Sequence, residues 1–220
     1  MSKSENIHPV FDRLLSRKER EKNLQQYSKV IWLVGLSGSG KSTIARALEH
    51  ELHLRNYKCM VLDGDNVRTG INSNLAFSQA DRKENIRRVA ETAKLFLDAG
   101  LITICSFITP LAEYRKLVEE VVGKNDLILI FIDAPIEACE KRDVKGLYAK
   151  ARRGEIKDFT GVNAPFEVPK TAALTVDTDG KTIYDSFVEV LKFVLPQLRH
   201  QDNSITQFEN YNIWFQAYVL

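Results

Sequence analysis

Apolar residues occur along the chain in two kinds of pattern. Short runs such as Val30–Val34 and Leu127–Ile132 contain no charged or polar interruption. Elsewhere apolar residues recur three or four positions apart, as in the stretch that includes Ile86, Val89 and Ala93. Uninterrupted runs are typical of strands covered on both faces, whereas the second spacing places apolar side chains along one face of a helix. The pattern therefore predicts buried strands that alternate with amphipathic helices.

The predicted elements cover most of the chain. Strands are expected at residues 30–34, 59–62, 101–108, 127–132 and 173–176, and helices at 41–56, after Ser78, and at 183–195. Ser78, with Asp81 three positions later, matches a capping box and predicts the start of the middle helix. Alternating strands and helices favour an α/β fold, in which a parallel sheet with right-handed crossovers binds ligands at the carboxyl ends of its strands.

Length and composition fit one α/β domain with appendages. The chain has 220 residues, of which 44% are hydrophobic and 27% charged, close to the averages of globular proteins. This composition excludes a disordered or fibrous chain. The net charge of +2, from 31 Lys and Arg against 29 Asp and Glu, is too small to indicate a nucleic-acid-binding protein.

The sequence has no segment that resembles a membrane span or a secretion signal. The longest purely apolar run, Leu127–Ile132, is far shorter than the ~20 residues that cross a bilayer, and the polar N-terminus has no apolar signal core. The three cysteines, Cys59, Cys105 and Cys139, are widely spaced, which favours buried free thiols in a reducing compartment. We therefore expect a cytoplasmic protein with no membrane partner.

Three segments differ in composition from the predicted core. In residues 1–28, Glu19 and Glu21 interleave with basic residues, which favours a solvated helical lead-in over a nucleic-acid-binding arm. Residues 144–170 are polar and basic and contain Gly and Pro. The last segment carries aromatic residues at helix-compatible spacing: Phe208, Tyr211, Trp214, Phe215 and Tyr218. We expect this tail to dock on its own domain or on a dimer partner, with binding to another protein as the alternative.

A phosphate-binding loop follows the first predicted strand. The sequence GLSGSGKS at residues 35–42 matches G-x-x-x-x-G-K-[ST] and stands between a strand and a helix, as the motif requires. Glycines let consecutive backbone N–H groups point at phosphate oxygens, and the start of the helix adds its positive dipole end. The residues expected to bind ATP here are Gly35, Leu36, Ser37, Gly38, Ser39, Gly40, Lys41, Ser42 and Thr43. Among them, Lys41 is expected to neutralise the β- and γ-phosphates and Ser42 to bind Mg²⁺.

Other features of the chain exclude two classes of P-loop protein and favour a third. A signalling GTPase needs N-K-x-D to read guanine, and residues 124–126 (Lys-Asn-Asp) have these residue types in the wrong order. A large motor ATPase needs a longer chain. The chain length and the basic segment 144–170 favour a small-molecule kinase whose lid closes over the site, because water would otherwise take the phosphoryl group.

An acidic pair ends the second predicted strand. Asp63 and Asp65 are two residues apart, so in an extended chain both side chains point the same way. No acid ends the apolar run 101–108, where many P-loop enzymes carry a magnesium-linked carboxylate. Asp63 is therefore the first candidate to orient an acceptor hydroxyl, accept its proton and hold Mg²⁺ through water. The alternative for an Asp-Gly pair is an ordinary turn.

A cluster of polar residues follows this strand. Arg82 and Asn85 lie in the first turns of the helix that the capping box predicts and share one of its faces, and Arg68 precedes them. Together with the helix N-terminus, these side chains favour the binding of an anion. The alternative from the pattern alone is surface salt bridging with Asp81 and Glu84.

At these motifs the chain resembles the adenylylsulfate kinases (APS kinases), which use MgATP to phosphorylate the 3′-hydroxyl of adenosine 5′-phosphosulfate (APS). Three motifs in this order are specific to that family: DGDNVR (63–68), FSQADRKENIRR (77–88) and KGLYAKAR (145–152). The resemblance implies a three-layer P-loop kinase fold with a five-stranded parallel sheet and a mobile lid at 144–170. It also implies a division of the chain into a polar extension (1–28), the kinase domain (29–195) and the aromatic tail (196–220).

The resemblance further implies roles for single residues at matching positions. The acceptor APS is expected to contact Asp63, Arg68, Phe77, Arg82, Asn85, Ile108, Thr109, Lys145, Gly146, Leu147 and Phe166. Among these, Phe77 and Phe166 resemble an aromatic pair that sandwiches the adenine of APS. Arg142 resembles a residue that packs against the adenine of ATP, and Lys150 and Arg152 resemble lid cations that approach the phosphates.

One departure from the family concerns residues 107–110. The chain has Phe-Ile-Thr-Pro where the family commonly has Phe-Ile-Ser-Pro, and that serine is often described as a phosphoenzyme intermediate. Thr109 keeps a hydroxyl, but direct in-line transfer does not need such an intermediate, so we expect Thr109 to be a substrate-loop residue. The arginine usually found near this proline is absent, and Arg115 is the candidate to replace it.

Together these features predict an adenylylsulfate kinase with Asp63 and Lys41 as catalytic residues and with ATP and Mg²⁺ as cofactors. The products would be ADP and 3′-phosphoadenosine 5′-phosphosulfate (PAPS), made in sulfate assimilation. The resemblance also implies a homodimer and a functional link to ATP sulfurylase, the enzyme that makes APS. Two alternatives stay open: a kinase of another small metabolite, such as a sugar acid or a nucleoside monophosphate, and a non-catalytic nucleotide-binding partner of ATP sulfurylase.

Overall fold

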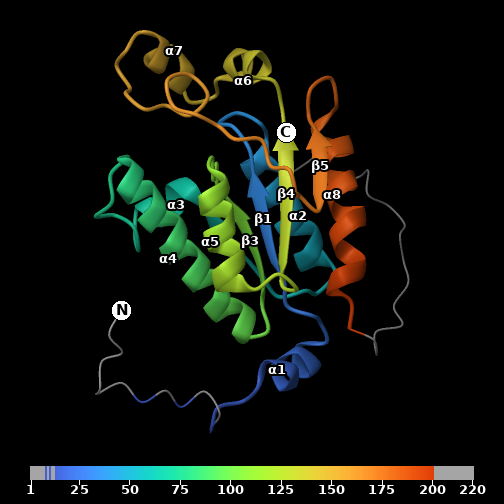
Figure 1. The fold of residues 1–220 in the computed structure, drawn as a ribbon. Helices are drawn as coiled ribbons and strands as arrows, with labels where there is room; N and C mark the ends of the chain where they lie inside the picture. Colours follow the sequence, from blue (N-terminus) through green and yellow to red (C-terminus); the bar gives the residue numbers. More distant parts are fainter. Residues whose placement is uncertain (1–7, 9, 11–12, 201–220) are drawn as a thin grey trace.

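A five-stranded parallel sheet forms the centre of the protein in the computed structural model, which describes residues 8, 10 and 13–200. The strands are β1 (Val30–Val34), β2 (Cys59–Asp63), β3 (Ile102–Ser106), β4 (Leu127–Asp133) and β5 (Leu174–Asp177). They lie in the order β2-β3-β1-β4-β5, and each neighbouring pair is parallel (Figure 1). The predicted strands and the predicted parallel sheet are confirmed. The aromatic residues of the tail, for which docking is expected, lie outside the described residues, and α8 continues to Leu198, past the expected domain boundary at residue 195.

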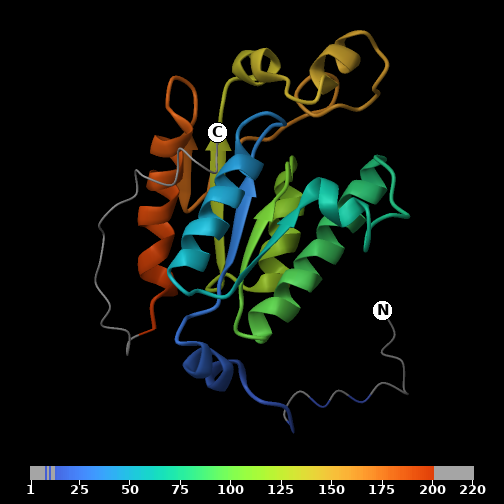
Figure 2. The same ribbon diagram turned by 180° about the vertical axis from the view of Figure 1, so that it is seen from behind.

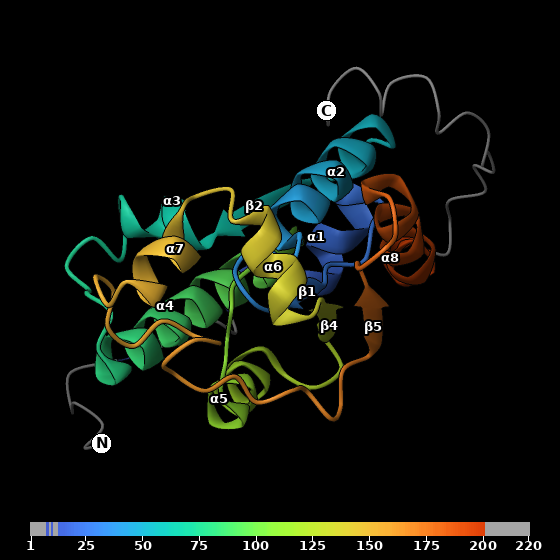
Figure 3. The ribbon, with the colours of Figure 1, turned by 90° about the horizontal axis from the view of Figure 1, so that it is seen from above.

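Helices cover both faces of the sheet. They are α1 (Arg17–Leu24), α2 (Lys41–Leu54), α3 (Gly64–Arg68), α4 (Gln79–Asp98), α5 (Ala112–Val122), α6 (Ile136–Arg142), α7 (Leu147–Arg152) and α8 (Ile183–Leu198). Seen from above, α2 and α8 lie on one side of the strands, and α4 and α5 lie on the other (Figure 3). The three-layer α/β architecture is therefore confirmed.

Two apolar cores lie on the two faces of the sheet because side chains alternate along each strand. Ile31 and Leu33 belong to the core shared with α2 and α8, whereas Val30 and Trp32 belong to the core shared with α4 and α5. All four side chains are fully buried. Burial on both faces explains why this strand is an uninterrupted apolar run in the sequence.

Local capping determines where the long helices begin. Ser78 has an extended backbone, and its hydroxyl accepts a hydrogen bond from the N–H of Asp81 at 3.1 Å, which confirms the predicted start of α4. Thr182 caps α8 in the same way through the N–H of Asp185. In contrast, α2 begins after Gly40 with no side-chain cap. The first backbone N–H groups of α2 can therefore donate hydrogen bonds to a ligand.

The chain departs from the expected boundaries after β2 and β3. Residues 64–68 form the short helix α3 where a loop was expected. β3 ends at Ser106, two residues before the apolar run ends. The chain then reaches Thr109, whose φ of +44° is incompatible with a strand. Both departures occur at the carboxyl edge of the sheet.

The N-terminal helix α1 is docked on the sheet domain. Arg17 donates a hydrogen bond from Nη1 to Asp126 at 2.6 Å, just before β4. Glu21 and Ser28 are buried and are joined by a hydrogen bond of 2.7 Å. The expected helix is present, but the expectation that it is solvated is wrong for this face. Alternating charges in the sequence could not reveal partners that lie far along the chain.

The helices α6 and α7 lie above the carboxyl ends of the strands, at the opposite end from α1 (Figures 1 and 2). A small apolar cluster that includes Cys139, Tyr148 and Phe159 holds this part together. The three cysteines are free, and Cys105 and Cys139 are buried. Among the described residues, no helix is long and apolar enough to cross a membrane.

Candidate active site

The loop between β1 and α2 follows a path that requires glycine. A Cβ atom on Gly35 would lie 2.3 Å from the carbonyl oxygen of Ile132 in β4, which is too close for any side chain. Gly40 has a φ of +103°, a left-handed value that other residues rarely adopt. The carbonyl of Leu36 accepts a hydrogen bond from the N–H of Ser39 at 3.2 Å. The loop is therefore a tight turn directly before the uncapped start of α2.

Lys41, the first residue of α2, points back into this loop. Its ammonium group donates to the Leu36 carbonyl oxygen at 2.6 Å, and its side chain is buried. Burial lowers the pKa of Lys41 to about 8, and the charge of Lys145 acts in the same direction, while Asp63 opposes it. Thr43 lies half-buried in the same turn. A buried cation beside the start of a helix favours an anionic ligand.

Three oxygen-bearing side chains meet next to Lys41. Ser42 Oγ donates to Asp63 Oδ2 at 2.7 Å and lies 3.2 Å from Ser106 Oγ. Asp63 and Ser106 end neighbouring strands and are paired in register. Oxygen atoms of this kind are the donors that Mg²⁺ prefers. The sequence pattern does not single out Ser106. The only feature that could have indicated it is a polar residue inside the apolar run 101–108, which contains no acidic residue.

The two carboxylates of the acidic pair have different surroundings. Asp63 caps α3, and its Oδ1 accepts a hydrogen bond from the N–H of Asp65 at 3.1 Å. The expectation that both side chains point the same way is therefore wrong, because the chain becomes helical directly after Asp63. Asp65 instead forms an ion pair with Lys145, which lies between α6 and α7. Asp63 thus contacts the P-loop helix, whereas Asp65 contacts the segment 144–170.

Two arginines and one exposed aromatic ring form the next part of the site. The guanidinium carbon of Arg68 lies 4.4 Å, and that of Arg82 6.0 Å, from the centre of the Phe77 ring. Phe77 is 63% exposed, so its ring is accessible to a ligand. Burial lowers the pKa of Arg68, and the charge of Arg82 lowers it further. An anionic ligand would offset this excess of positive charge.

Arg82 and Asn85 share a helix but have different partners. Arg82 donates to the hydroxyl of Thr160 at 3.0 Å and to the carbonyl oxygen of Asp158 at 2.6 Å, both in the segment 144–170. Asn85 is buried, and its amide oxygen accepts from Asn72 Nδ2 at 3.0 Å. Asn72 is a further polar residue that the sequence pattern does not single out. Arg82 therefore links α4 to the segment 144–170, whereas Asn85 belongs to a buried polar pair.

The loop after β3 holds its polar groups inside the protein. Thr109 is 1% exposed, and its hydroxyl oxygen accepts from the indole N–H of Trp32 at 2.9 Å. Arg115 donates from Nη1 to the carbonyl oxygens of Thr109 and Pro110, each at 3.1 Å. Arg115 is itself buried and holds this loop from within. Of the expected substrate residues in the loop, only Ile108 is partly exposed.

The end of the segment 144–170 runs beside this loop. The N–H of Glu167 donates to the Pro110 carbonyl oxygen at 2.9 Å, and the Glu167 carboxylate accepts from the N–H of Ala112 at 2.6 Å. Phe166 stacks on Phe131 near the end of β4, with 5.9 Å between the ring centres. These contacts bring Phe166 to the carboxyl edge of the sheet.

Contacts also join the P-loop to α6 and α7. Arg142 donates from Nη1 to the carbonyl oxygen of Gly38 at 3.3 Å and from Nη2 to that of Thr178 at 2.7 Å. The hydroxyl of Tyr148 donates to the carbonyl oxygen of Ser37 at 2.9 Å. Thr178 and Tyr148 therefore belong beside the phosphate-binding loop. Thr178 does not stand out in the sequence, and Tyr148 lies in the motif at 145–152 without any sign there that its hydroxyl contacts the loop.

The other expected site residues in the segment 144–170 differ in burial and in their contacts. Gly146 precedes α7 with a φ of +65°, and Leu147 after it is half-buried. Lys150 is exposed, and Arg152 forms an ion pair with Glu140 of α6. In this structure Arg152 is therefore directed to α6.

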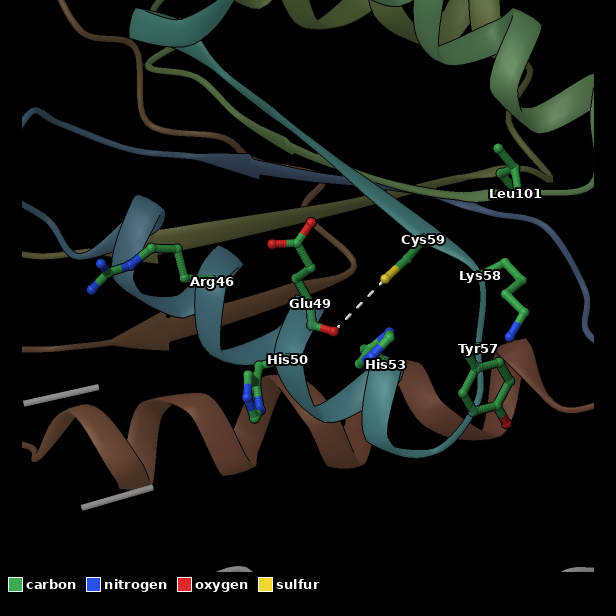
Figure 4. A pocket seen from close by; sticks show the side chains of 8 residues that line it. All are labelled: Arg46, Glu49, His50, His53, Tyr57, Lys58, Cys59 and Leu101. Atoms are coloured by element: carbon green, nitrogen blue, oxygen red, sulfur yellow. Dashed lines mark hydrogen bonds between the residues drawn. The ribbon is translucent and has the colours of Figure 1, made fainter. Parts of the chain in front are cut away.

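A separate cavity of about 540 Å³ lies at the far end of α2. Its lining includes Arg46, His50 and His53 of α2, Cys59 at the start of β2 and Leu101 just before β3 (Figure 4). The P-loop residues and the acidic pair lie at the opposite ends of the same elements. The cavity is therefore not part of the site described above.

The sequence matches one family of known proteins. Residues 27–177 match the family model described as "Adenylylsulphate kinase". A protein named adenylyl-sulfate kinase from Bacteroides thetaiotaomicron is 54% identical over 198 residues, which cover 90% of this chain and 98% of that protein.

Solved structures show the same likeness. The Mycobacterium tuberculosis APS kinase CysC in complex with AMPPNP and APS has a TM-score of 0.73 and 44% identity, over 77% of this chain and 98% of that one. A hexameric APS kinase from Thiobacillus denitrificans has a TM-score of 0.60 and 27% identity, over 79% of this chain and 30% of that one.

Proposed function

The chain belongs to the adenylylsulfate kinase family, and on this premise we propose that it transfers the γ-phosphoryl group of ATP to the 3′-hydroxyl of APS, giving PAPS and ADP. The observation that carries the proposal is the contact between Ser42 and Asp63, which sets an acidic strand tip against the phosphate-binding loop. Arg68 and Arg82 follow that strand tip and supply positive charge for a second, anionic nucleotide.

The donor ATP is assigned to the loop between β1 and α2. Lys41 and the first N–H groups of α2 would bind the β- and γ-phosphates. An approaching phosphate would raise the pKa of Lys41 from its lowered value of about 8 and keep the side chain charged. Arg142, which contacts the loop at Gly38, is assigned to the adenine of ATP by its likeness to the family.

Mg²⁺ fits the oxygen donors beside this loop. Ser42 would bind the ion directly and Asp63 through water, and Ser106 Oγ lies 3.2 Å from Ser42 Oγ. The bound ion offsets the charge of the phosphates and helps to orient the transferred group.

The acceptor APS is assigned to the far side of Asp63. The guanidinium groups of Arg68 and Arg82 suit the two neighbouring anionic groups of a phosphosulfate, and the rings of Phe77 and Phe166 suit its adenine. Asp63 would orient the 3′-hydroxyl and take its proton as the new O–P bond forms. The bond from the γ-phosphorus to the β,γ-bridging oxygen breaks at the same time, and ADP leaves with that electron pair.

The segment 144–170 is proposed to close over both nucleotides. Its existing contacts support this role, since Lys145 pairs with Asp65 and Thr160 accepts a hydrogen bond from Arg82. Closure would exclude water, which competes with the 3′-hydroxyl for the phosphoryl group.

The proposal also covers the oligomeric state of the protein and its location in the cell. The family likeness favours a homodimer that works with ATP sulfurylase in the cytoplasm, and the free thiols Cys59, Cys105 and Cys139 fit a reducing compartment. Light scattering of the purified protein distinguishes a dimer from a monomer or a higher assembly. Co-purification with ATP sulfurylase tests the functional link.

An assay of ADP release tests the activity itself. The purified protein is given ATP and Mg²⁺ with APS, with AMP or with gluconate, and the nucleotide products are separated. ADP and PAPS formed with APS, and no turnover of the other two acceptors, support the proposal. Turnover of AMP or gluconate instead would support a kinase of another metabolite. Binding of ATP and APS without PAPS formation would support a non-catalytic partner of ATP sulfurylase. Removal of Mg²⁺ with EDTA should abolish turnover.

A further inference from the structure

Residues 107–111, which connect β3 to α5, are held by hydrogen bonds from distant parts of the chain. The central residue is Thr109, whose hydroxyl oxygen accepts from the Trp32 indole N–H at 2.9 Å. Its φ of +44° is an outlier for a β-branched residue. Such a conformation persists only where surrounding contacts hold it. The contacts around Thr109 therefore stabilise this left-handed backbone conformation.

A second set of contacts holds the backbone on the other side of the same residue. Arg115 is buried and donates to the carbonyl oxygens of both Thr109 and Pro110. Because Arg115 is buried, the two carbonyl oxygens replace part of the hydration that its guanidinium group loses. Thr109 is thus held by its hydroxyl from β1 and by its carbonyl group from α5.

The held loop supports the turn that carries Asp63. The Phe107 ring stacks on Trp32, with 5.4 Å between ring centres, and the Phe107 N–H donates to the Leu33 carbonyl oxygen at 3.1 Å. A Cβ atom on Gly64 would lie 3.6 Å from the Phe107 ring and 3.6 Å from the Ser106 carbonyl oxygen. The Asp63–Gly64 turn therefore packs directly against the start of this loop.

The same loop also supports Phe166. The Pro110 carbonyl oxygen accepts from both Arg115 and the Glu167 N–H, and the Ala112 N–H donates to the Glu167 carboxylate. The loop therefore connects the turn that carries Asp63 with the segment that carries Phe166. These are the two places to which the 3′-hydroxyl and the adenine of the acceptor are assigned.

We propose that Thr109 is a positioning residue for the acceptor nucleotide. Its buried hydroxyl, held by the Trp32 indole, fixes the loop so that Asp63 and Phe166 keep the separation that one APS molecule requires. This inference rests on the proposed function and adds a residue that acts without touching the reacting atoms. The Thr109 hydroxyl is not a carrier of the phosphoryl group, because it is 1% exposed and engaged with Trp32.

Three substitutions of similar size test the proposal. Thr109→Val removes the hydroxyl and leaves the shape, whereas Thr109→Ser keeps the hydroxyl. Thr103→Val is the matched control, because Thr103 is a fully buried threonine of β3 whose hydroxyl has no hydrogen-bond partner in the described part of the chain. We expect Thr109→Val to raise KM for APS about tenfold, because valine leaves the buried indole N–H of Trp32 without an acceptor. KM for ATP should stay near its wild-type value, Thr109→Ser should restore most of the loss, and Thr103→Val should have no effect.

A spectroscopic measurement reports on the hydrogen bond itself. The chain has two tryptophans, so in a Trp214→Phe background the indole N–H resonance in a ¹⁵N-labelled sample belongs to Trp32. This resonance should shift in Thr109→Val and stay close to its wild-type position in Thr109→Ser and Thr103→Val. Trp32→Phe removes the donor and should raise KM for APS as Thr109→Val does, and the double variant should be no worse than either single one. Trp32→Phe carries the test if Thr109→Val does not fold.

Each alternative outcome has a distinct meaning. A wild-type protein that forms no PAPS overturns the proposed function. An active wild type whose KM for APS is unchanged in both Thr109→Val and Trp32→Phe overturns only the positioning role. Loss of kcat in Thr109→Val at wild-type KM, together with phosphothreonine 109 in the ATP-treated wild type by mass spectrometry, would assign the hydroxyl a chemical role and also overturn it.

Discussion

Ser42 Oγ donates a 2.7 Å hydrogen bond to Asp63 Oδ2 and thereby joins the first turn of α2 to the tip of β2. β2 does not neighbour β1, from which the P-loop leads into α2, because β3 lies between them. The contact therefore passes over the end of β3, where Ser106 Oγ lies 3.2 Å from Ser42 Oγ. This relationship sets the proposed proton acceptor directly beside the loop assigned to ATP.

Asp63→Asn separates the chemical role of Asp63 from its structural role. Asparagine caps helices as well as aspartate does, so α3 should keep its start and the free energy of unfolding should change by less than about 0.5 kcal/mol. Loss of the carboxylate should lower kcat about 10²–10⁴-fold. Asp63→Ala should lose as much activity and also about 1 kcal/mol of stability, because the cap is gone. Urea unfolding and the ADP assay measure both effects, and wild-type kcat in Asp63→Asn would remove Asp63 from the reaction.

Lys41→Ala should lower kcat about 10²–10³-fold, the usual effect of losing one charge-stabilising donor in a catalytic site. The fold should persist, since a buried ammonium group is replaced by a small helix-forming residue. Lys58→Ala is the control, because Lys58 is exposed and lies beyond the opposite end of α2. Near-normal turnover in Lys41→Ala would contradict the assignment of ATP to this loop.

The lowered pKa of Lys41, about 8, predicts a pH dependence of ATP capture. Above that pH the free enzyme loses the charge, so kcat/KM for ATP should fall on an alkaline limb with an apparent pKa near 8. At saturating ATP, kcat should fall only at higher pH, because bound phosphate raises the pKa of the lysine. Steady-state rates from pH 6.5 to about 10 measure both limbs; a kcat/KM that stays flat through this range would contradict the prediction.

The same shift has a consequence for stability without nucleotide. An unfolded lysine has a pKa of about 10.4. Between the folded value of about 8 and the unfolded value, the unfolded chain binds more protons than the folded one. The contribution of Lys41 to the free energy of unfolding should therefore rise with pH in this window. Urea unfolding of the wild type and of Lys41→Met at several pH values measures this contribution, as the difference between their free energies of unfolding.

Gly35→Ala should destabilise the protein by about 1–3 kcal/mol, the usual effect of forcing extra atoms into a packed site. The new Cβ atom would lie 2.3 Å from the Ile132 carbonyl oxygen, so β1 and β4 would have to separate. Gly70→Ala is the matched control, since a Cβ atom there meets nothing within 4 Å. Thermal or urea unfolding of the two variants should differ clearly, and equal stability would show that the loop can relax.

Arg68→Ala should raise KM for APS about 10- to 100-fold and leave KM for ATP nearly unchanged, because a charge-assisted contact to the acceptor alone is lost. Arg87→Ala is the control, as Arg87 is an exposed arginine of α4 that pairs with Glu84 and Glu91. Initial rates with each nucleotide varied in turn measure the effect. Equal increases of both KM values would mean that Arg68 acts on the fold instead of on APS.

Features that depend on neighbours in the chain were predictable from the sequence. The central strands β1, β3 and β4 appear as apolar runs because helices cover both of their faces, and the start of α4 follows from the capping contact between Ser78 and Asp81. The P-loop motif was also recognisable, because its glycines, lysine and serine stand at fixed spacing in residues 35–42, although the clash that requires Gly35 is with Ile132 of β4. The motifs at 63–68, 77–88 and 145–152 likewise sufficed to identify the adenylylsulfate kinase family, to which the chain belongs.

Features that depend on which distant residues meet were decided only by the tertiary structure. Trp32 and Thr109 are 77 residues apart, and nothing near either one indicates that the indole N–H finds that hydroxyl. Ser106, Tyr148 and Thr178 join the site for the same reason. Asp65 turns away from Asp63 because a helix begins between them. Local sequence patterns predict whether a residue is buried, caps a helix or lies in a left-handed turn. Which distant residue completes a hydrogen bond depends on how the helices and strands pack together.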